Sequence, residues 1–396
     1  MRGECYMQFA ICQRRMLHAV RHMSVEVADE SLMSGMRGIQ DLNKLHSLRF
    51  GIKLNVEITW FNQLSNILYL NLKGCKLVKL PESMGELNSL RYLDISGSSV
   101  QELPEKFCCL YSLQVVDASR PSLKAISPDV IKLINLRRLA LPAGCSPKLS
   151  EISRLGNLSR LQNLKRFTVG TGDGRKVGEL RGMNQLSGTL TISSICNVKN
   201  EEEAAEASLV EKQYLQELVL LWREHGTWKV KSSENGVVEA LRPPPRIERL
   251  KVQGFGGDSF SPSWFRPESL STLRSLELFN YRCLRTISIP SLAPVQWLML
   301  TEAGIKAVPI LGGSTGGERT QHTSSSSSSS NGTACLRGLT TIHLVGCDHL
   351  QDLDRCLSPE YLPSIVCIEI IKSSYQGLSM PVDSFVGFKY LQELKI

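Results

Sequence analysis

Residues 67–72, which read Ile67-Leu68-Tyr69-Leu70-Asn71-Leu72, carry the pattern that repeats along this 396-residue chain. Their core-forming residues stand at relative positions 1, 4 and 6. The pattern returns three times in steps of 23 residues, as Leu90/Leu93/Ile95, Leu113/Val116/Ala118 and Leu136/Leu139/Leu141. Two further columns keep the same step, one with Leu80, Leu103, Ile126 and Leu149 and one with Leu87, Leu110 and Leu133. Three columns in phase predict an internal structural repeat.

The pattern continues outside this block with looser spacing. Nine more units begin at Leu45, Leu164, Leu215, Ile247, Leu273, Val295, Leu339, Ile365 and Leu391. Leu190 and Ile192 form a degenerate fourteenth unit, in which Leu186 is one position out of phase. Positions 4 and 6 point to the same side of a short strand and therefore into a core. We predict an α/β leucine-rich-repeat solenoid: one curved parallel sheet of fourteen strands on the concave face, with short helices and irregular segments on the convex face.

Repeat spacing divides the chain into five parts. Residues 1–41 form a junction segment ahead of the repeats, and residues 42–182 are regular repeats of about 23 residues. Residues 183–311 are irregular repeats with a helical insertion near 199–216, which is rich in Glu and Ala. Residues 312–332, with seven consecutive serines, predict a disordered Ser/Gly-rich loop. Residues 333–396 are irregular repeats that we expect to be truncated, because no polar capping unit follows Ile396.

Motifs that carry chemistry are weak in this sequence. The stretch Gly170-Thr171-Gly172-Asp173-Gly174-Arg175-Lys176 lacks the spacing of a phosphate-binding P-loop and is expected to be a flexible loop. Cys5, Cys12, His18 and His22 do not have zinc-finger spacing. The adjacent Cys108 and Cys109 are expected to be buried small thiols. We predict no catalytic residue, no cofactor and no metal, and therefore no enzyme.

Targeting signals are also missing from the sequence. The first residues do not form an apolar stretch of signal-peptide length, so the twelve cysteines are expected to be reduced thiols. The uncharged stretch 286–301 contains Pro290 and Pro294 and is too short to cross a membrane. These features predict a cytoplasmic protein without a transmembrane segment, with the nucleus as an alternative location.

Positive charge is concentrated in one part of the chain. The formal net charge is +8, and residues 134–182 hold ten Lys or Arg against three acidic residues. A solvated basic face and a dock for an acidic protein surface both explain this cluster. Nucleic acid is disfavoured because Phe167 is the only aromatic residue there. The candidate dock consists of Arg137, Arg138, Lys165, Arg166, Arg175 and Lys176.

The concave face is the candidate protein-binding surface. Exposed aromatic residues and Met, surrounded by charges of both signs, are typical of interfaces. The strand phase places eighteen candidates on this face: Tyr69, Asn71, Lys73, Tyr92, Asp94, Asp117, Arg138, Arg166, Thr168, Glu217, Arg249, Lys251, Glu277, Phe279, Trp297, Met299, His343 and Glu369.

Several stretches resemble a known family. Leu80-Pro81-Glu82-Ser83-Met84-Gly85-Glu86-Leu87 and its continuation to Gly97 are similar to the repeats of plant NLR (nucleotide-binding leucine-rich-repeat) disease-resistance proteins. Phe167-Thr168-Val169-Gly170, Gly178-Glu179-Leu180-Arg181-Gly182 and the segment Leu215-Gln216-Glu217-Leu218 to Trp222 resemble the coiled-coil class of that family. The resemblance implies an intracellular receptor whose early repeats contact a nucleotide-binding module and whose later repeats help to recognise a pathogen effector or a guarded host protein.

The resemblance covers only the leucine-rich-repeat part, because a P-loop and a Met-His-Asp switch motif are not found in this sequence. It therefore implies the sensing and autoinhibitory part of such a receptor, acting through a non-catalytic protein-recognition surface. Two alternatives stay open at this point. The first alternative to the receptor hypothesis is a free-standing leucine-rich-repeat adaptor for ubiquitin ligase or signalling complexes. The second is a non-functional fragment of a receptor gene.

Overall fold

The computed structural model describes residues 20–25, 42–51, 61–119, 123–142, 144–145, 148–223, 232–257, 259–266, 268–280, 286–287, 295–301, 337–346, 357–371 and 385–395. The predicted loop at 312–332 lies outside these residues, as do Cys5, Cys12, His18 and Ile396. The chain forms two compact units. Unit 1 comprises Met1–Leu164, Asp173–Arg175 and Gly182–Leu186, and unit 2 comprises Lys165–Gly172, Lys176–Arg181 and Ser187–Ile396.

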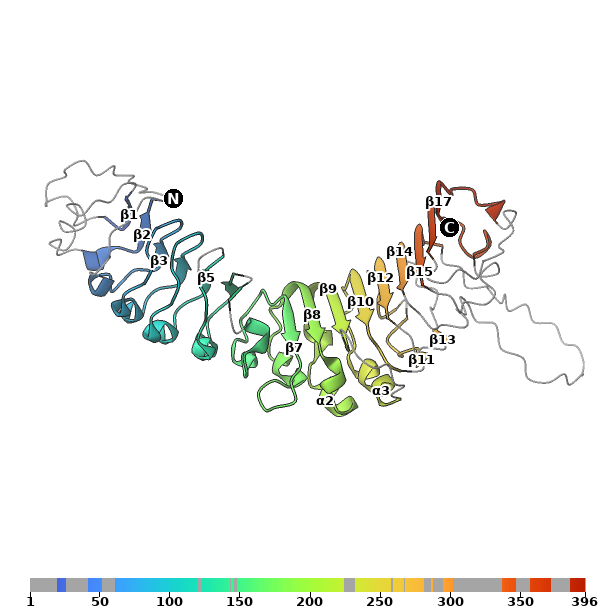
Figure 1. Ribbon diagram of the computed structural model, residues 1–396, viewed down its shortest axis with the longest axis horizontal. Coiled ribbons are helices and arrows are strands. Elements are labelled where there is room, and N and C mark those ends of the chain that lie inside the picture. The colour runs from blue at the N-terminus through green and yellow to red at the C-terminus, as the bar shows by residue number, and fades with distance from the viewer. Residues whose placement is uncertain are drawn as a thin grey trace, which may run out of the picture. The chain divides into compact units, whose positions relative to one another are not determined.

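Unit 1 contains a six-stranded parallel sheet in sequence order (Figure 1). Its strands are β1 (His22–Val25), β2 (Ser47–Phe50), β3 (Tyr69–Asn71), β4 (Tyr92–Asp94), β5 (Val115–Asp117) and β6 (Arg138–Ala140). The fourth repeat position pairs with itself from strand to strand, so Leu48, Leu70, Leu93, Val116 and Leu139 form one buried row. The 23-residue step therefore brings equivalent residues of consecutive repeats into contact.

Short 3₁₀ helices form the outer side of unit 1. They are η2 (Leu42–Lys44), η3 (Phe61–Gln63), η4 (Glu82–Glu86), η5 (Glu105–Cys109), η6 (Pro128–Lys132), η7 (Leu149–Glu151) and η8 (Leu155–Asn157). The buried Leu87, Leu110 and Leu133 end η4, η5 and η6. Gly85 allows η4 and η5 to approach closely, because a Cβ at Gly85 would lie 2.3 Å from Cβ of Lys106.

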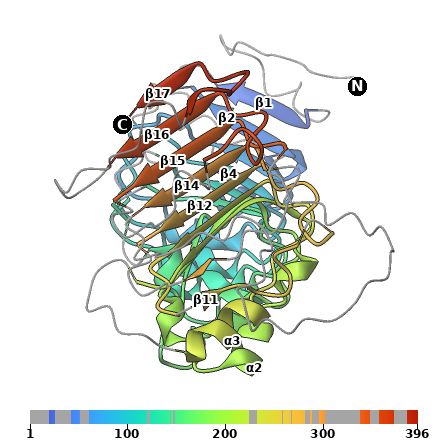
Figure 2. The ribbon, with the colours of Figure 1, turned by 90° about the vertical axis from the view of Figure 1, so that its right-hand side faces the viewer.

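Unit 2 contains a nine-stranded parallel sheet with the order β17-β16-β15-β14-β12-β10-β9-β8-β7 (Figure 2). Its strands are β7 (Arg166–Thr168), β8 (Ser187–Ser193), β9 (Tyr214–Leu221), β10 (Arg249–Gln253), β12 (Ser275–Phe279), β14 (Trp297–Thr301), β15 (Thr341–Val345), β16 (Cys367–Ile371) and β17 (Glu393–Lys395). β11 (Ser259–Phe260) and β13 (Thr286–Ile287) form a separate pair.

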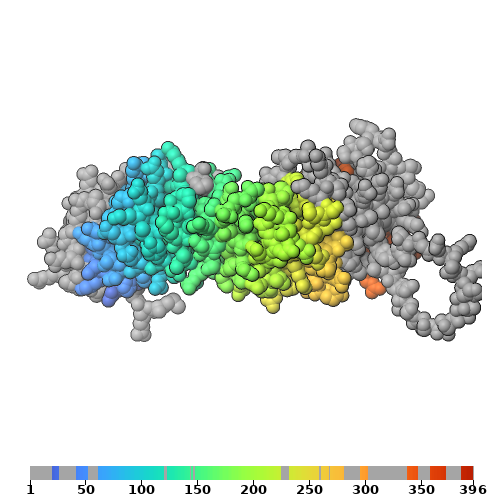
Figure 3. Space-filling view, turned by 90° about the horizontal axis from the view of Figure 1, so that it is seen from below, coloured from blue at the N-terminus to red at the C-terminus, as the bar shows by residue number. Residues whose placement is uncertain are grey.

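The helices of unit 2 lie on the side opposite the sheet, and Figure 3 looks onto the helical side. They are α2 (Glu201–Ala205), α3 (Ser233–Ala240), η9 (Val177–Leu180), η10 (Ile195–Asn197) and η11 (Leu209–Glu211). A register shift between Gly188 and Thr189 in β8 accommodates the position that puts Leu186 out of phase. Leu186 and Leu190 are both buried, so the irregular repeats keep their core.

All fourteen predicted strands are present, but they belong to two sheets instead of one. The step from Leu136 to Leu164 is 28 residues instead of 23, and this longer segment contains η7 and η8. The side chain of Asn163 then takes the place of a strand at the edge of β6. Its Oδ1 accepts from the backbone N–H of Leu139 (3.1 Å), and its Nδ2 donates to the carbonyl oxygen of Leu139 (3.3 Å).

The helix predicted near 199–216 is much shorter than expected. α2 ends at Ala205, and Ser208 has a left-handed φ of 45°. Lys212 is fully buried and its Nζ donates to the carbonyl oxygen of Leu180 (2.7 Å), while burial lowers the pKa of this amine to about 8. Burial of the residues that lead into β9 thus overrides the helix propensity of the Glu/Ala-rich segment.

Four smaller expectations also change. Leu103, Leu141 and Leu149 are only half-buried, and the last two flank the longer segment that interrupts the regular repeats. Cys108 is buried but Cys109 is exposed at the end of η5. Leu394 is 40% exposed, because among the described residues β17 pairs with β16 alone. Part of the predicted junction segment, His22–Val25, is the first strand of the sheet and continues its register.

Replacing Asn163 with Ala is expected to destabilise unit 1 by about 1–3 kcal/mol, because both main-chain groups of Leu139 lose their side-chain partner. The control is Asn135→Ala, which removes a single bond from Nδ2 of Asn135 to the carbonyl oxygen of Tyr111 (2.8 Å) at an exposed position. Urea denaturation measures both. Equal losses for the two variants would show that Asn163 does not protect the edge of β6.

Candidate functional site

The concave face of unit 1 has two rows of side chains that follow the strand register. The first row consists of His22, Ser47, Tyr69, Tyr92, Val115 and Arg138. The second row consists of Ser24, Arg49, Asn71, Asp94, Asp117 and Ala140. Val115 was not among the predicted residues. Its position in the strand phase is the same as that of Tyr69 and Tyr92.

Three predicted binding residues in the second row support the turns that follow their strands. Oδ1 of Asn71, Asp94 and Asp117 accepts from the backbone N–H of the residue two positions later, at 3.0, 2.9 and 2.9 Å. Asn71 and Asp94 are 9% and 6% exposed. The carboxylates of Asp94 and Asp117 are therefore hydrogen-bonded to the main chain, and a partner would sense the charge of the buried Asp94 more than it would contact its atoms.

Tyr69 and Tyr92 form a flat aromatic stack in the first row. Their ring centroids lie 4.4 Å apart and the rings are tilted by 12°. Nδ2 of Asn71 donates to the hydroxyl oxygen of Tyr69 (3.1 Å), which fixes the outer end of that ring. Burial, and next the charge of Asp94, raise the pKa of Tyr92 to about 12. Both rings remain half-exposed, so they are available for contact.

The concave face of unit 2 starts with a ladder of ion pairs. Oε2 of Glu217 lies 3.1 Å from Nε of Arg249, and Oε1 of Glu217 lies 3.5 Å from Nζ of Lys251. The same Lys251 amine lies 3.1 Å from Oε2 of Glu277, whose side chain is 6% exposed. These charges neutralise one another across β9, β10 and β12.

Further along unit 2 the concave face becomes aromatic. The ring of Trp297 meets that of His343 edge-on at a centroid distance of 5.7 Å. His343 contacts Glu369 through Nδ1, and Nζ of Lys395 lies 3.9 Å from Oε1 of Glu369. Trp297, Met299, His343 and Phe279 are all half-exposed. This surface thus offers aromatic and thioether contacts beside a neutralised carboxylate.

The remaining predicted residues are distributed over both units. Lys73, Arg138, Arg166 and Arg249 are exposed, and Thr168 is half-buried beside Ser193, with their hydroxyl oxygens 3.1 Å apart. In the basic cluster, Arg137, Arg138 and Arg175 belong to unit 1, while Lys165, Arg166 and Lys176 belong to unit 2. All six are exposed except Arg175, which is half-buried. The structure therefore leaves them accessible, and their role in docking stays a prediction.

A buried ion pair in unit 2 was not foreseen. Arg223 contacts Glu234 at the start of α3, and Oε2 of Glu234 also accepts from the backbone N–H of Gly256 (2.7 Å). Beside it lies an aromatic cluster formed by Trp222, Phe255, Phe260, Trp264 and Phe265. Both features are buried, so removing one partner of the ion pair would leave an uncompensated buried charge and destabilise the repeats.

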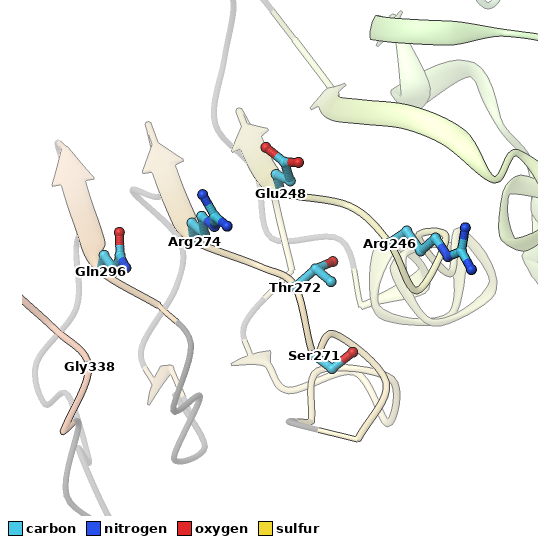
Figure 4. Close-up of a pocket in the computed structure, with 7 residues that line it drawn as sticks. All are labelled: Arg246, Glu248, Ser271, Thr272, Arg274, Gln296 and Gly338. Atoms are coloured by element: carbon cyan, nitrogen blue, oxygen red, sulfur yellow. The ribbon is translucent and has the colours of Figure 1, made fainter.

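A cavity of about 510 Å³ lies in unit 2 at the starts of β10, β12 and β14 (Figure 4). Its lining is polar and includes Arg246, Glu248, Ser271, Thr272, Arg274, Gln296 and Gly338. Figure 4 shows that Arg246 points away from Arg274 and that the side chains do not converge on one point. The cavity therefore lacks the converging groups of a catalytic site.

The described part of the chain also offers no metal site and no membrane helix. Among the residues that the structure describes, no group of three His, Cys, Asp or Glu could hold a metal ion. Within the same residues, no helix is long and apolar enough to cross a membrane. Burial raises the pKa of Cys75 to about 12 and that of Cys108 to about 11, so neither is a reactive thiolate.

These features define the class of protein: a leucine-rich-repeat solenoid with two rows of side chains on each concave face. Residues 177–302 match the family of R13L1/DRL21 leucine-rich repeats. The chain is 38% identical over 147 residues to the RGA4 disease resistance protein of Solanum bulbocastanum, a match that covers 37% of this chain and 14% of that protein. It is 33% identical over 143 residues to the disease resistance RPP13-like protein 1 of Arabidopsis thaliana, covering 33% of this chain and 13% of that protein.

The resemblance to plant NLR disease-resistance proteins is thus confirmed over the leucine-rich-repeat region. Among solved structures, the chain is similar to InlJ from Listeria monocytogenes, at 12% identity and a TM-score of 0.47 over 89% of this chain and 72% of that chain. It is also similar to the plant peptide hormone receptor RGFR1 in complex with RGF2, at 15% identity and a TM-score of 0.43 over 89% of this chain and 58% of that chain. The fold assignment rests on the strand register and not on these likenesses.

Asp94→Ala is expected to destabilise unit 1 by about 1–3 kcal/mol, because the N–H of Ser96 and the amide of Asn71 both lose their acceptor. Asp94→Asn is expected to keep nearly all of the stability, because Asn71 already fills the same role in the preceding repeat. The midpoint of chemical denaturation compares the two. A large loss for both would show that the charge, and not the turn-supporting oxygen, stabilises this position.

Proposed function

We propose that this chain is the non-catalytic protein-recognition part of a plant intracellular immune receptor and that it binds protein partners through its concave face. The observation that carries the proposal is the similarity of the repeats to plant disease resistance proteins. The half-exposed Tyr69, Tyr92, Trp297 and Met299 on the strands support it, because such side chains are enriched at interfaces. Cytoplasmic location belongs to the same proposal.

Two tasks follow from this proposal. The concave face contributes to the recognition of a pathogen effector or a guarded host protein. The basic cluster contacts the acidic surface of a nucleotide-binding module and so keeps the receptor inactive. Exposed Arg and Lys support this second task, because clustered charge steers and orients an oppositely charged protein surface. Arg137, Arg138, Lys165 and Lys176 have no ion pair with a carboxylate among the residues that the structure describes.

Reversing the charge at Arg137, Arg138, Lys165 and Arg166 with Glu is expected to weaken binding of a separately supplied nucleotide-binding module by about tenfold or more. The control reverses four other exposed cations, Lys76, Arg91, Lys106 and Lys124, and changes the net charge equally. A pull-down at low and high salt measures both variants. Binding that both variants weaken to the same extent would leave only a net-charge effect and remove the docking role.

Trp297→Ala is expected to abolish partner recognition without unfolding the repeats, because truncating a central aromatic residue at an interface costs about 2 kcal/mol or more. The control is Thr341→Ala, which changes the neighbour of Trp297 in the same row. The response of leaves that express the whole receptor reports recognition, and circular dichroism reports folding. A collapsed spectrum would mean that Trp297 is needed for the core, and an unchanged response would argue against recognition at this face.

A further inference from the structure

The polar cavity at the starts of β10, β12 and β14, which we call the strand-start cavity, borders the concave face of unit 2. Arg274 and Gln296 are part of its lining. The residues that follow them in the sequence, Ser275 and Trp297, are neighbours in register on the concave face. A partner segment that contacts Trp297 therefore reaches the edge of the strand-start cavity.

The lining of the strand-start cavity carries more positive than negative charge. Arg246 and Arg274 are exposed, and Glu248 is half-exposed. Among the residues that the structure describes, neither arginine forms an ion pair with a carboxylate. On the concave face close by, Arg249 and Lys251 are both paired with glutamates. Two guanidinium groups at this edge are thus left to attract negative charge from outside the chain.

The main chain around the cavity has its hydrogen bonds within the sheet. The N–H of Arg274 donates to the carbonyl oxygen of Glu248 (2.8 Å), and the N–H of Gln296 donates to that of Arg274 (2.8 Å). The hydroxyl of Thr272 donates to the carbonyl oxygen of Ile247 (2.9 Å), so its proton is used inside the chain. The walls of the cavity are therefore fixed, and charged and amide side chains remain to bind a ligand.

The directions of these side chains favour an extended ligand. In Figure 4, Arg246 points away from Arg274, and the carboxylate of Glu248 lies between them. A compact anion such as phosphate is therefore not clamped by both guanidinium groups, and Glu248 repels it. An extended peptide with two acidic side chains can meet each arginine separately. Its main chain also supplies N–H groups for Glu248 and both donors and acceptors for the amide of Gln296.

We propose that the strand-start cavity binds an acidic segment of a protein partner, with one carboxylate on Arg246, another on Arg274 and the peptide main chain between them. The inference rests on the proposed recognition function and states the chemistry of the partner at one edge of the concave face. Arginine suits this task, because its planar fork of N–H groups matches a carboxylate and its charge is permanent.

The test uses the full chain and a fluorescent peptide, acetyl-Gly-Glu-Gly-Glu-Gly-amide, with a version in which glutamine replaces both glutamates. The lining variant Arg246→Gln/Arg274→Gln removes both guanidinium groups of the cavity. Its matched control, Arg242→Gln/Arg266→Gln, removes two exposed arginines of unit 2 that do not line the cavity. Fluorescence anisotropy at low salt measures the dissociation constants, and circular dichroism measures folding.

We expect the acidic peptide to bind about fivefold more weakly to the lining variant, because two exposed ion pairs of modest strength are lost, with little change for the control. The glutamine peptide is expected to show no difference between the chains. Glu248→Gln removes the negative charge of the lining and should strengthen binding of the acidic peptide by about twofold. A loss of folding cannot imitate this gain, so Glu248→Gln keeps the inference testable if the lining variant misfolds.

Three results would overturn the inference. Equal weakening by the lining variant and its control would leave only an effect of net charge. Unchanged binding to both the lining variant and Glu248→Gln would show that the peptide does not enter the cavity. Displacement of the peptide by inorganic phosphate, at an ionic strength matched with chloride, would show that the cavity takes a compact anion instead of an acidic segment.

The proposed function can survive a negative result here. If the cavity variants leave peptide binding unchanged but Trp297→Ala still abolishes the response in leaves, only the acidic docking site is wrong. If neither the cavity variants nor Trp297→Ala has an effect, recognition by the concave face is wrong as well.

Discussion

The structure depends on one constraint: each strand must bury its apolar side chains against the strands before and after it. A single repeat cannot do this, because its strand has only three residues in most of unit 1. The row Leu48, Leu70, Leu93, Val116 and Leu139 is buried only because each member lies next to its equivalents. Neighbouring repeats therefore stabilise one another cooperatively. The buried row also fixes the register of the side chains on the opposite side of each strand.

Because of that register, equivalent side chains of consecutive repeats form rows on the concave face, so their charges and contacts can be compared from repeat to repeat. In unit 2, cations and carboxylates on neighbouring strands neutralise one another, as Lys251 does between Glu217 and Glu277. In unit 1, Asp94 and Asp117 stand side by side and are held by hydrogen bonds from the chain itself. The two faces share one architecture but differ in whether their carboxylates form ion pairs. Such differences give a recognition surface its specificity.

The helical side differs from the strand side, because the residues described on it pack within the chain. Gly85 lets η4 lie against η5, and Lys212 is buried to reach a carbonyl oxygen of Leu180. Arg223 and Glu234 tie the start of α3 to the inner layer. Substitutions at these positions act on stability first, so they are poor probes of recognition. The strand side is where stability and binding can be separated.

Repeat phase, the buried residues and the set of side chains on the concave face follow from the sequence, because the alternation along a strand is a local property of the backbone. All fourteen predicted strands formed for this reason. The contributions of single polar residues could not be predicted in the same way. Asn71, Asp94 and Asp117 were placed on the correct face, but nothing local shows that backbone N–H groups two residues later would hold them.

The end of the first sheet, the length of α2 and the pairing of charges follow from contacts between distant segments of the chain. Asn163 reaches Leu139 across 24 residues, Lys212 reaches Leu180 across 32, and Arg249 reaches Glu217 across 32. Each contact requires two segments to be brought together by the burial of other residues. The pattern of the repeat can be read from the order of the residues. The fold determined which polar groups meet, because hydrogen bonds and ion pairs depend on distances that no local pattern specifies.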